Sequence, residues 1–220
     1  MLNQIQSLNM ELGKLVENAK RSLVVIRDGG RRIGAGSIWH SDGLIVTNAH
    51  VTAQGHLAVS LPGGNVHPAK VIASDTEKDI AVLGIEIHDL EMPHLPTIEL
   101  GDSRDLVAGQ WAMALGHPLG VQGAVSMGVI IEVGSDPPEA PGGGREWVAA
   151  SLSLRPGHSG GPFLDAQGRL VGINTVMVGS NVGLAVPVNV VKRFLKDRLG
   201  TEKPETRDSL KCPISLRLTA

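Results

Sequence analysis

The amino-acid sequence predicts an all-β fold, arranged as a sandwich or a barrel. The 220-residue chain contains 28 glycines and 13 prolines. Many short runs of Val, Ile and Leu lie between these turn-forming residues, which is typical of short strands joined by turns. A chain of this length suits one large domain or two fused sub-domains, and it can bury a substantial core.

The first segment, residues 1–21, differs from the rest because its periodicity is helical. Apolar residues recur at steps of three and four along residues 2–20, at Ile5, Leu8, Leu12, Leu15 and Ala19. This spacing places them on one face of a helix. We expect that face to pack on its own domain, with self-association as the alternative.

From Ser22 onward the apolar residues form short runs bounded by turns. Strands are predicted near residues 22–26, 31–39, 44–47, 56–61, 66–73 and 80–87. After a polar crossover at 100–107, a second set is predicted near 110–116, 122–133, 146–152, 162–165, 169–176 and 182–186. The chain should therefore form barrel one at 22–100 and barrel two at 107–187, within one domain at 22–200.

The segments that follow or interrupt the strands have their own signatures. A helix is predicted over 187–199, with Pro187 in its first turn and Gly200 at its end. Residues 134–144 are too rich in Pro and Gly for regular structure and should form a mobile surface loop. The tail 201–220 ends in a period-two apolar pattern, so we expect it to join a sheet edge of its own molecule or of a neighbour.

Composition excludes several classes of function. A formal net charge of −2 and an aromatic content of 2% give no basis for nucleic-acid binding. No apolar run approaches the ~20 residues needed to span a bilayer. The only cysteine, Cys212, cannot form an internal disulfide. Residues 1–17 lack the pattern of a secretory signal, which predicts a cytoplasmic protein if Met1 is the native start.

A serine between glycines is the strongest sign of chemistry. In residues 155–162, Ser159 follows Gly157-His158 and precedes Gly160-Gly161. Glycines let backbone approach a reacting carbonyl closely, and the N–H groups of Gly157 and Ser159 are candidate donors to an oxyanion. A serine nucleophile also needs a base and a group that orients the base.

Two stretches supply these partners. His50 directly follows the predicted strand 44–47, and Asp79 begins the apolar strand 80–87, where an unpaired carboxylate would be costly. The chain order is then His50, Asp79, Ser159, with two members in the first half and the nucleophile in the second. This order predicts an active site between the two barrels.

Three motifs carry a resemblance to a known family: Thr47-Asn48-Ala49-His50-Val51, Asp79-Ile80-Ala81-Val82-Leu83 and Gly157-His158-Ser159-Gly160-Gly161-Pro162. With further matches between residues 23 and 195, they resemble the chymotrypsin-fold serine proteases of the HtrA (Deg) family. The resemblance implies two six-stranded antiparallel β-barrels with an N-terminal and a C-terminal helix. It also implies His50 as general base, Asp79 as its orienter and Ser159 as nucleophile.

The same resemblance implies the surroundings of the triad. The backbone of Gly157, His158 and Ser159 would form the oxyanion hole. Loops at 116–128, 132–146, 152–158 and 174–182 would be the activation, sensor and specificity loops. The substrate pocket would be lined by Ser153, Leu154, Ile173 and Thr175. None of these is acidic, so we expect cleavage after small or medium aliphatic residues.

The chain departs from the family pattern in four respects. His158 stands where the family usually has Asn or Asp before the serine. Residues 149–153 lack the usual aspartate of the strand that leads to the nucleophile loop, and Arg155 is a candidate replacement. No PDZ domain follows residue 200, and residues 1–21 do not match the aromatic-rich segment associated with family trimers.

These observations predict a serine endopeptidase that cleaves unfolded or flexible protein segments through an acyl-enzyme. The alternative is a latent protease-fold module that binds proteins as a chaperone or scaffold. No cofactor or metal is expected, because the spacing of residues 88–94, which contain two histidines, matches no metal site. The expected partners are protein or peptide substrates, and a homo-oligomer could form through the N-terminal helix or the tail.

Overall fold

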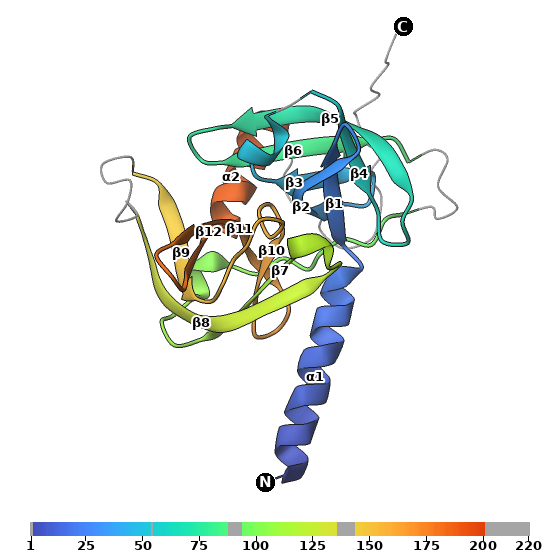
Figure 1. Ribbon diagram of the computed structural model, residues 1–220. Helices are drawn as coiled ribbons and strands as arrows, with labels where there is room; N and C mark the ends of the chain where they lie inside the picture. The colour runs from blue at the N-terminus through green and yellow to red at the C-terminus, as the bar shows by residue number, and fades with distance from the viewer. Residues whose placement is uncertain (1, 54, 88–93, 136–143, 201–220) are drawn as a thin grey trace, which may run out of the picture.

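The computed structural model describes residues 2–53, 55–87, 94–135 and 144–200, which form two closed antiparallel barrels and two helices (Figure 1). The predicted all-β, two-barrel fold is confirmed. Each barrel has six strands. Most of the predicted loop at 134–144, most of the segment 88–94 and the tail 201–220 lie outside the described residues.

The first barrel is built from the first six strands in the order β1-β2-β3-β6-β5-β4. It closes through pairing of β1 with β4. Its strands are β1 (Leu23–Asp28), β2 (Arg31–His40), β3 (Leu44–Thr47), β4 (Leu57–Ser60), β5 (Val66–Asp75) and β6 (Ile80–Ile85).

The second barrel has the order β10-β11-β12-β9-β8-β7 and closes through β7 and β10. Its strands are β7 (Trp111–Gly116), β8 (Ala124–Ser135), β9 (Glu146–Ser151), β10 (Pro162–Asp165), β11 (Leu170–Val178) and β12 (Val182–Pro187). Short 3₁₀ turns, η1 (His50–Thr52), η2 (Ser103–Asp105) and η3 (Pro118–Gly120), occur in the connections.

Four of the five apolar clusters among the described residues hold this arrangement together. Each barrel is filled by its own inward-facing residues, such as Ile38 in the first and Phe163 in the second. A third cluster joins Ala35 of the first barrel to Leu115 of the second. A fourth places α2 (Val188–Leu199) against both barrels, with Phe194 among its residues. Burial of these side chains therefore fixes how the barrels face one another.

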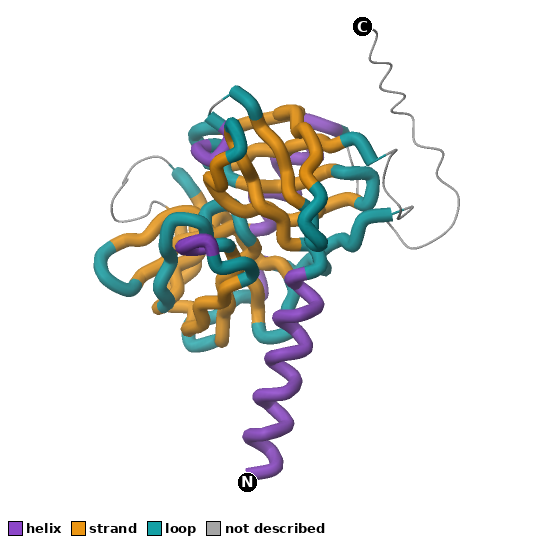
Figure 2. Tube along the Cα trace, turned by 45° about the vertical axis from the view of Figure 1, so that its right-hand side comes forward, coloured by secondary structure: helices purple, strands orange, loops and turns teal. Residues whose placement is uncertain are grey.

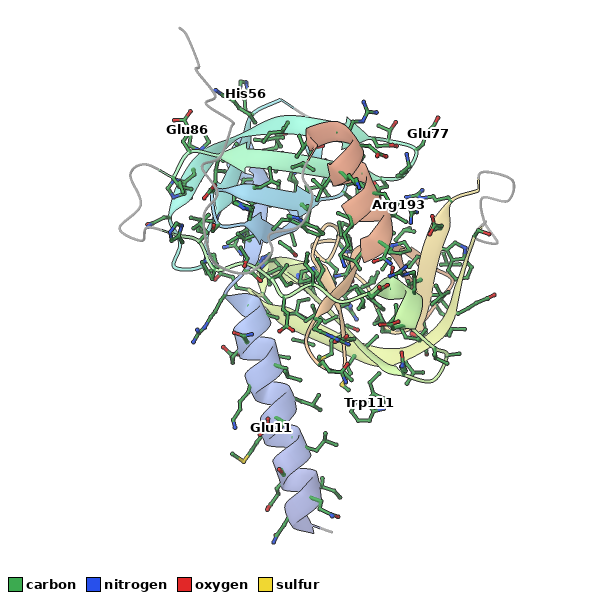
Figure 3. The ribbon with its side chains drawn as sticks, turned by 180° about the vertical axis from the view of Figure 1, so that it is seen from behind. Glu11, His56, Glu77, Glu86, Trp111 and Arg193 are labelled. Carbon is green, nitrogen blue, oxygen red and sulfur yellow. The ribbon has the colours of Figure 1, made fainter. Side chains whose placement is uncertain are left out.

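The helix α1 (Leu2–Lys20) packs on the body only along its second half (Figure 2). Val16 and Ala19 belong to the cluster that joins the barrels. Ile5, Leu8 and Met10 are between 50% and 62% exposed, and this first half extends away from the body (Figure 3). The expectation that the stripe packs on its own domain is thus correct only for its second half.

The helix α2 ends where the sequence predicts and begins one residue later, at Val188. Pro187 is the N-cap residue, with extended backbone, and Gly200 adopts a left-handed conformation that ends the helix. Within the described residues, no helix is both long and apolar enough to cross a membrane.

Candidate active site

His50 and Asp79 are neighbours because their strands are neighbours. Antiparallel pairing of β3 with β6 sets Thr47 opposite Ala81, so the residue after β3 meets the residue before β6. Asp79 has a positive φ of 55°, which costs a residue with a side chain on the order of 1–3 kcal/mol. The amide of the buried Asn48 donates to the Asp79 carbonyl at 2.9 Å and stabilises this conformation.

The Asp79 carboxylate holds His50 at two points. The His50 ring Nδ1 lies 2.9 Å from both carboxylate oxygens, and the His50 backbone N–H donates to Oδ1 at 3.1 Å. A carboxylate can only accept, so Nδ1 carries the proton and Nε2 presents a lone pair. The His50 side chain is half exposed. The pair therefore presents an oriented base to solvent.

Thr175 of β11 completes the surroundings of Asp79 from the second barrel. Its hydroxyl donates to Oδ2 of Asp79 at 2.6 Å. Burial acts to raise the pKa of Asp79, but the hydrogen bonds from His50 and Thr175 outweigh it and the pKa is lowered. Asp79 is therefore ionised at neutral pH.

Ser159 lies in a loop that contacts both barrels. The N–H of Ala35 in β2 donates to the Ser159 carbonyl at 2.8 Å, and the N–H of Gly160 donates to the Asn174 carbonyl at 2.9 Å. Gly160 has a φ of 81°, and a Cβ there would collide with Thr47 and Ala35. Only glycine fits this approach, which brings the serine to the junction of the barrels.

The loop before Ser159 leaves two backbone donors available. The N–H of His158, the third group implied for the oxyanion hole, donates to the Arg155 carbonyl at 2.9 Å in this structure. Among the hydrogen bonds between described residues, none uses the N–H of Gly157 or of Ser159. These two groups can serve a developing oxyanion.

The Ser159 hydroxyl is not directed at the base in this structure. Its Oγ donates to the Thr175 carbonyl at 3.1 Å. Thr175 therefore binds two members of the triad, Asp79 through its side chain and Ser159 through its backbone. A rotation about the Ser159 side chain has to break the second bond before Oγ can reach His50.

Two buried histidines lie behind the loop. His158 accepts the Arg155 N–H at Nδ1, at 3.0 Å, and its Nε2 is buried with no partner among the described residues. His117 accepts the Gly123 N–H, and its Nε2 lies 3.2 Å from the Val24 carbonyl. Burial lowers the pKa of both rings, so both are neutral.

The four residues expected to line the substrate pocket have different surroundings in the structure. Ile173 is fully buried in the cluster beneath α2, so it does not line a pocket. The Thr175 hydroxyl is committed to Asp79. Leu154 is 7% exposed and packs over Gly183, whose added Cβ would lie 2.9 Å from Leu154 Cγ. Ser153 is exposed, with its hydroxyl 3.3 Å from the Asn181 amide oxygen.

One residue of this site has no signal in the sequence pattern. Arg145, directly before β9, places Nη2 3.8 Å from Oδ2 of Asp79 and forms an ion pair with it. Nothing in the local sequence places the start of β9 near β6, because the approach depends on how the two barrels pack.

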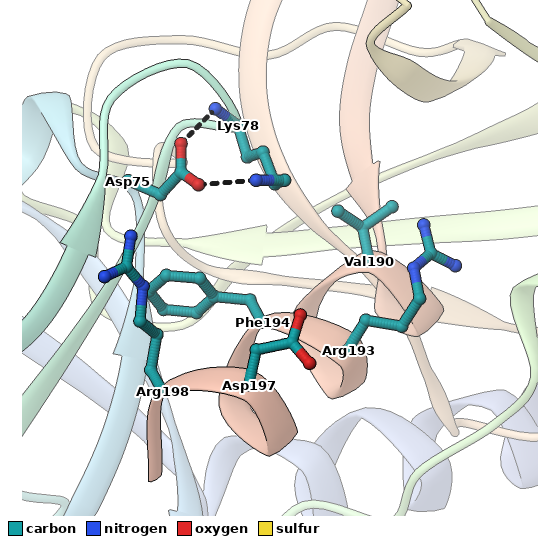
Figure 4. A pocket seen from close by; sticks show the side chains of 7 residues that line it. All are labelled: Asp75, Lys78, Val190, Arg193, Phe194, Asp197 and Arg198. Atoms are coloured by element: carbon teal, nitrogen blue, oxygen red, sulfur yellow. Dashed lines mark hydrogen bonds and ion pairs between the residues drawn. The ribbon is translucent and has the colours of Figure 1, made fainter.

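The structure also contains a cavity of about 370 Å³ beside α2 (Figure 4). Its lining includes none of the triad residues and consists of Asp75, Lys78, Val190, Arg193, Phe194, Asp197 and Arg198. Within the described parts of the chain, His, Cys, Asp and Glu side chains form no group of three that could hold a metal ion.

Comparison with known proteins agrees with this geometry. Residues 34–173 match the family model described as a trypsin-like peptidase domain. The putative serine protease HhoB of Synechocystis is 34% identical over 177 residues, which are 78% of this chain and 41% of HhoB. The mitochondrial serine protease HTRA2 of Bos taurus is 34% identical over 165 residues, which are 74% of this chain and 35% of HTRA2.

Solved structures show the same fold. The HtrA-type protease AlgW with a decapeptide aligns with a TM-score of 0.75 and 25% identity, over 86% of this chain and 67% of AlgW. An AlgW S227A variant with a tripeptide aligns equally well at 28% identity, over 84% of this chain and 62% of that protein. The chain spans between about one third and two fifths of the length of the curated relatives that it matches.

Proposed function

The chain belongs to the trypsin-like peptidase family, and from that premise we propose that it is a serine endopeptidase that works through an acyl-enzyme. The observation that carries the proposal is the double contact of His50 with the ionised Asp79. It orients the ring so that Nε2 can accept a proton. The HtrA-type relatives support the same activity.

In the proposed reaction Ser159 Oγ attacks the carbonyl carbon of the peptide bond while its proton passes to Nε2 of His50. Asp79 stabilises the imidazolium that results. The carbonyl oxygen becomes an oxyanion that accepts from the N–H groups of Gly157 and Ser159. Each such donor is worth about 10²–10³-fold in rate. His50 then returns the proton to the leaving amine, and water hydrolyses the acyl-enzyme by the reverse sequence.

The proposed substrates are unfolded or flexible protein segments with a small or medium aliphatic residue before the scissile bond. The support for this preference is that none of the four residues expected to line the pocket, Ser153, Leu154, Ile173 and Thr175, is acidic. A pocket without a carboxylate favours an aliphatic side chain over that of Lys or Arg.

A second candidate function is a latent protease-fold module that binds proteins without cleaving them. The hydrogen bond from Ser159 Oγ to the Thr175 carbonyl favours this alternative, because it directs the hydroxyl away from His50. The two functions differ in whether a bound peptide or a change of conditions releases Oγ.

The proposed partners also include a second copy of the chain. Apolar side chains cover the outer face of β8, where Val125, Met127, Val129 and Ile131 are between 38% and 43% exposed. Trp111, which pairs with Val129 across the strands, is 44% exposed. Ile5 and Leu8 of α1 are also exposed. Exposed apolar side chains of this kind favour association. The tail 201–220, outside the described residues, is the other proposed contact.

Cleavage-site profiling of a denatured proteome tests the proposed activity. Wild-type protein should release peptides with aliphatic residues before the cut, and the Ser159→Ala variant should release none. Cuts after Lys or Arg would contradict the proposed specificity. No cuts at any pH, or with peptides added, would favour the latent module.

A further inference from the structure

Met177 connects two segments that meet at Ser159. It lies on β11, two residues beyond Thr175, whose carbonyl accepts the Ser159 hydroxyl at 3.1 Å. The Met177 sulfur accepts the backbone N–H of Leu154 at 3.0 Å. Leu154 belongs to the segment that leads into the nucleophile loop. The methionine side chain therefore spans from the strand that holds the nucleophile at rest to the segment that precedes the nucleophile.

A bulge in β11 brings Met177 to this position. The register of β11 with β12 shifts between Asn174 and Met177, and Met177 then pairs with Gly183 (Figure 1). An extra residue of this kind re-aims the side chains around it. A Cβ on Gly183 would lie 2.7 Å from Leu152 and 2.9 Å from Leu154, so these leucines fill the space over the glycine. Met177 packs on the cluster that contains both leucines and is itself only half-buried, so the cluster ends here at a methionine side chain.

The residue before the scissile bond has to place its side chain near these segments. Attack requires its carbonyl carbon to lie about 3–3.5 Å from Ser159 Oγ. The carbonyl oxygen must also reach the N–H groups of Gly157 and Ser159. The Cα of the same residue is bonded to this carbon, so its side chain begins beside the nucleophile loop. On the side of the second barrel, that point is bounded by the loop and by β11, the two segments that Met177 connects.

We propose that Met177 is a specificity-determining residue, whose side chain restricts the space available to the residue before the scissile bond. This inference rests on the proposed function and narrows its substrate class to small aliphatic residues, with Ala and Val favoured over Leu and Met. Beyond Cβ, Met177 carries Cγ, Sδ and Cε, which match in number the Cγ and Cδ atoms by which Leu exceeds Ala. Methionine is flexible, but the N–H of Leu154 holds this sulfur in place. A Leu side chain of the substrate therefore meets occupied space.

The neighbouring side chains leave this role to Met177. Leu152 and Leu154 are 3% and 7% exposed and Ile173 is fully buried, so all three belong to the interior. Ser153 is exposed, but its side chain is short and polar. Of these residues, Met177 is the one that is apolar, partly accessible and long enough to fill the space between the loop and β11.

The test compares two peptides that differ only in the residue before the scissile bond, Ala or Leu. Met177→Ala removes Cγ, Sδ and Cε, so the ratio of kcat/KM for the Leu peptide over the Ala peptide should rise at least about 10-fold. Met177→Leu conserves volume and should keep a ratio close to that of wild type. Met177→Val is shorter than methionine and favours a strand, so it should give an intermediate rise even if Met177→Ala does not fold.

Met10→Ala is the matched control. It removes the same atoms from a methionine of α1 that is 62% exposed, so the ratio should not change. An unchanged ratio in both Met177→Ala and Met177→Val would overturn the inference. An equal loss of activity toward both peptides would overturn it as well, because a residue with only a structural role affects the two peptides alike.

Peptide binding in a Ser159→Ala background separates this inference from the proposed function. Peptides that end in Ala or Leu represent the part of a substrate before the cut, and their binding needs no catalysis. Adding Met177→Ala should raise the affinity for the Leu peptide, relative to the Ala peptide, at least about 10-fold. That rise, together with a wild type that cleaves no peptide, would refute the proposed function and leave this inference standing. Cleavage by the wild type with unchanged relative affinities would do the reverse.

Discussion

The Thr175 hydroxyl donates to Asp79 across the junction of the two barrels, at 2.6 Å, while the Thr175 carbonyl accepts from Ser159 at 3.1 Å. One residue of the second barrel thus fixes the carboxylate that orients the base and also holds the nucleophile at rest. Its side chain and its backbone have opposite consequences for activity: the first supports the His50–Asp79 pair, and the second keeps Ser159 away from it.

The hydroxyl of Thr175 should matter even though the residue does not touch substrate. Thr175→Val keeps the shape but removes a hydrogen bond to a charged group, worth about 1.5 kcal/mol, so kcat/KM should fall about 10-fold. Thr175→Ser, the control, should lose much less. Steady-state kinetics with a peptide substrate measures both, and equal activity of Val variant and wild type would show that the bond to Asp79 is dispensable.

The buried histidine of the nucleophile loop should make the protein less stable in acid. Burial lowers the pKa of His158 in the folded protein, whereas the unfolded chain binds a proton near pH 6.5. Below that pH the unfolded state holds more protons, so the free energy of unfolding falls as pH falls. His158→Asn should lose less stability than wild type between pH ~7.5 and ~5.

Urea unfolding at the two pH values measures this difference. His56→Asn is the control, because His56 is exposed and should contribute little. An identical loss of stability in wild type and His158→Asn would show that His158 takes up its proton in the folded state as well.

Gly160 should tolerate no side chain. Gly160→Ala places a Cβ against Thr47 and Ala35 at a positive φ, and we expect it to destabilise the fold by about 3 kcal/mol and to displace Ser159. Gly55→Ala, where a Cβ meets open space, should leave the urea midpoint within error of wild type. A fully stable and active Gly160→Ala protein would mean that the loop lies farther from β2 than described.

The exposed stripe of α1 should determine the mass of the protein in solution. Replacing Ile5 and Leu8 with Glu removes apolar contact area without disturbing the buried half of the helix, so light scattering should report a monomer where wild type is larger. Glu11→Gln, a change on the same exposed part of α1, is the control.

Deleting residues 208–220 tests the proposed contact through the tail in the same assay. A wild-type protein that is already a monomer would contradict association through α1 and through the tail alike.

The fold could be predicted from sequence because turn residues and strand periodicity agree along the chain. Turns such as Pro62-Gly63-Gly64 and the alternation within strands place each strand close to its observed bounds. The site could be predicted because His50 shortly follows one strand and Asp79 directly precedes another, and the pairing of β3 with β6 brings them together. Substrate preference, oligomeric state, cellular location and the tail stay predictions.

The surroundings of two expected pocket residues depend on which way their strand faces. Ile173 and Thr175 are two residues apart on β11 and so share a face, and that face is directed at the first barrel. Period-two alternation would have shown that they share one environment, but not that this is the junction of the barrels. Arg145 could not be found, because its approach to Asp79 arises from packing between segments far apart in the chain.

The central claim, that Ser159 is a nucleophile activated by His50, is tested most directly with a fluorophosphonate. The serine oxygen attacks phosphorus, fluoride leaves, and the adduct is located by mass spectrometry. The account predicts an adduct on Ser159 in the wild type, none in Ser159→Ala, and strongly reduced labelling in His50→Gln. A wild-type protein that stays unlabelled over pH 5 to 9, with and without added peptides, would contradict it.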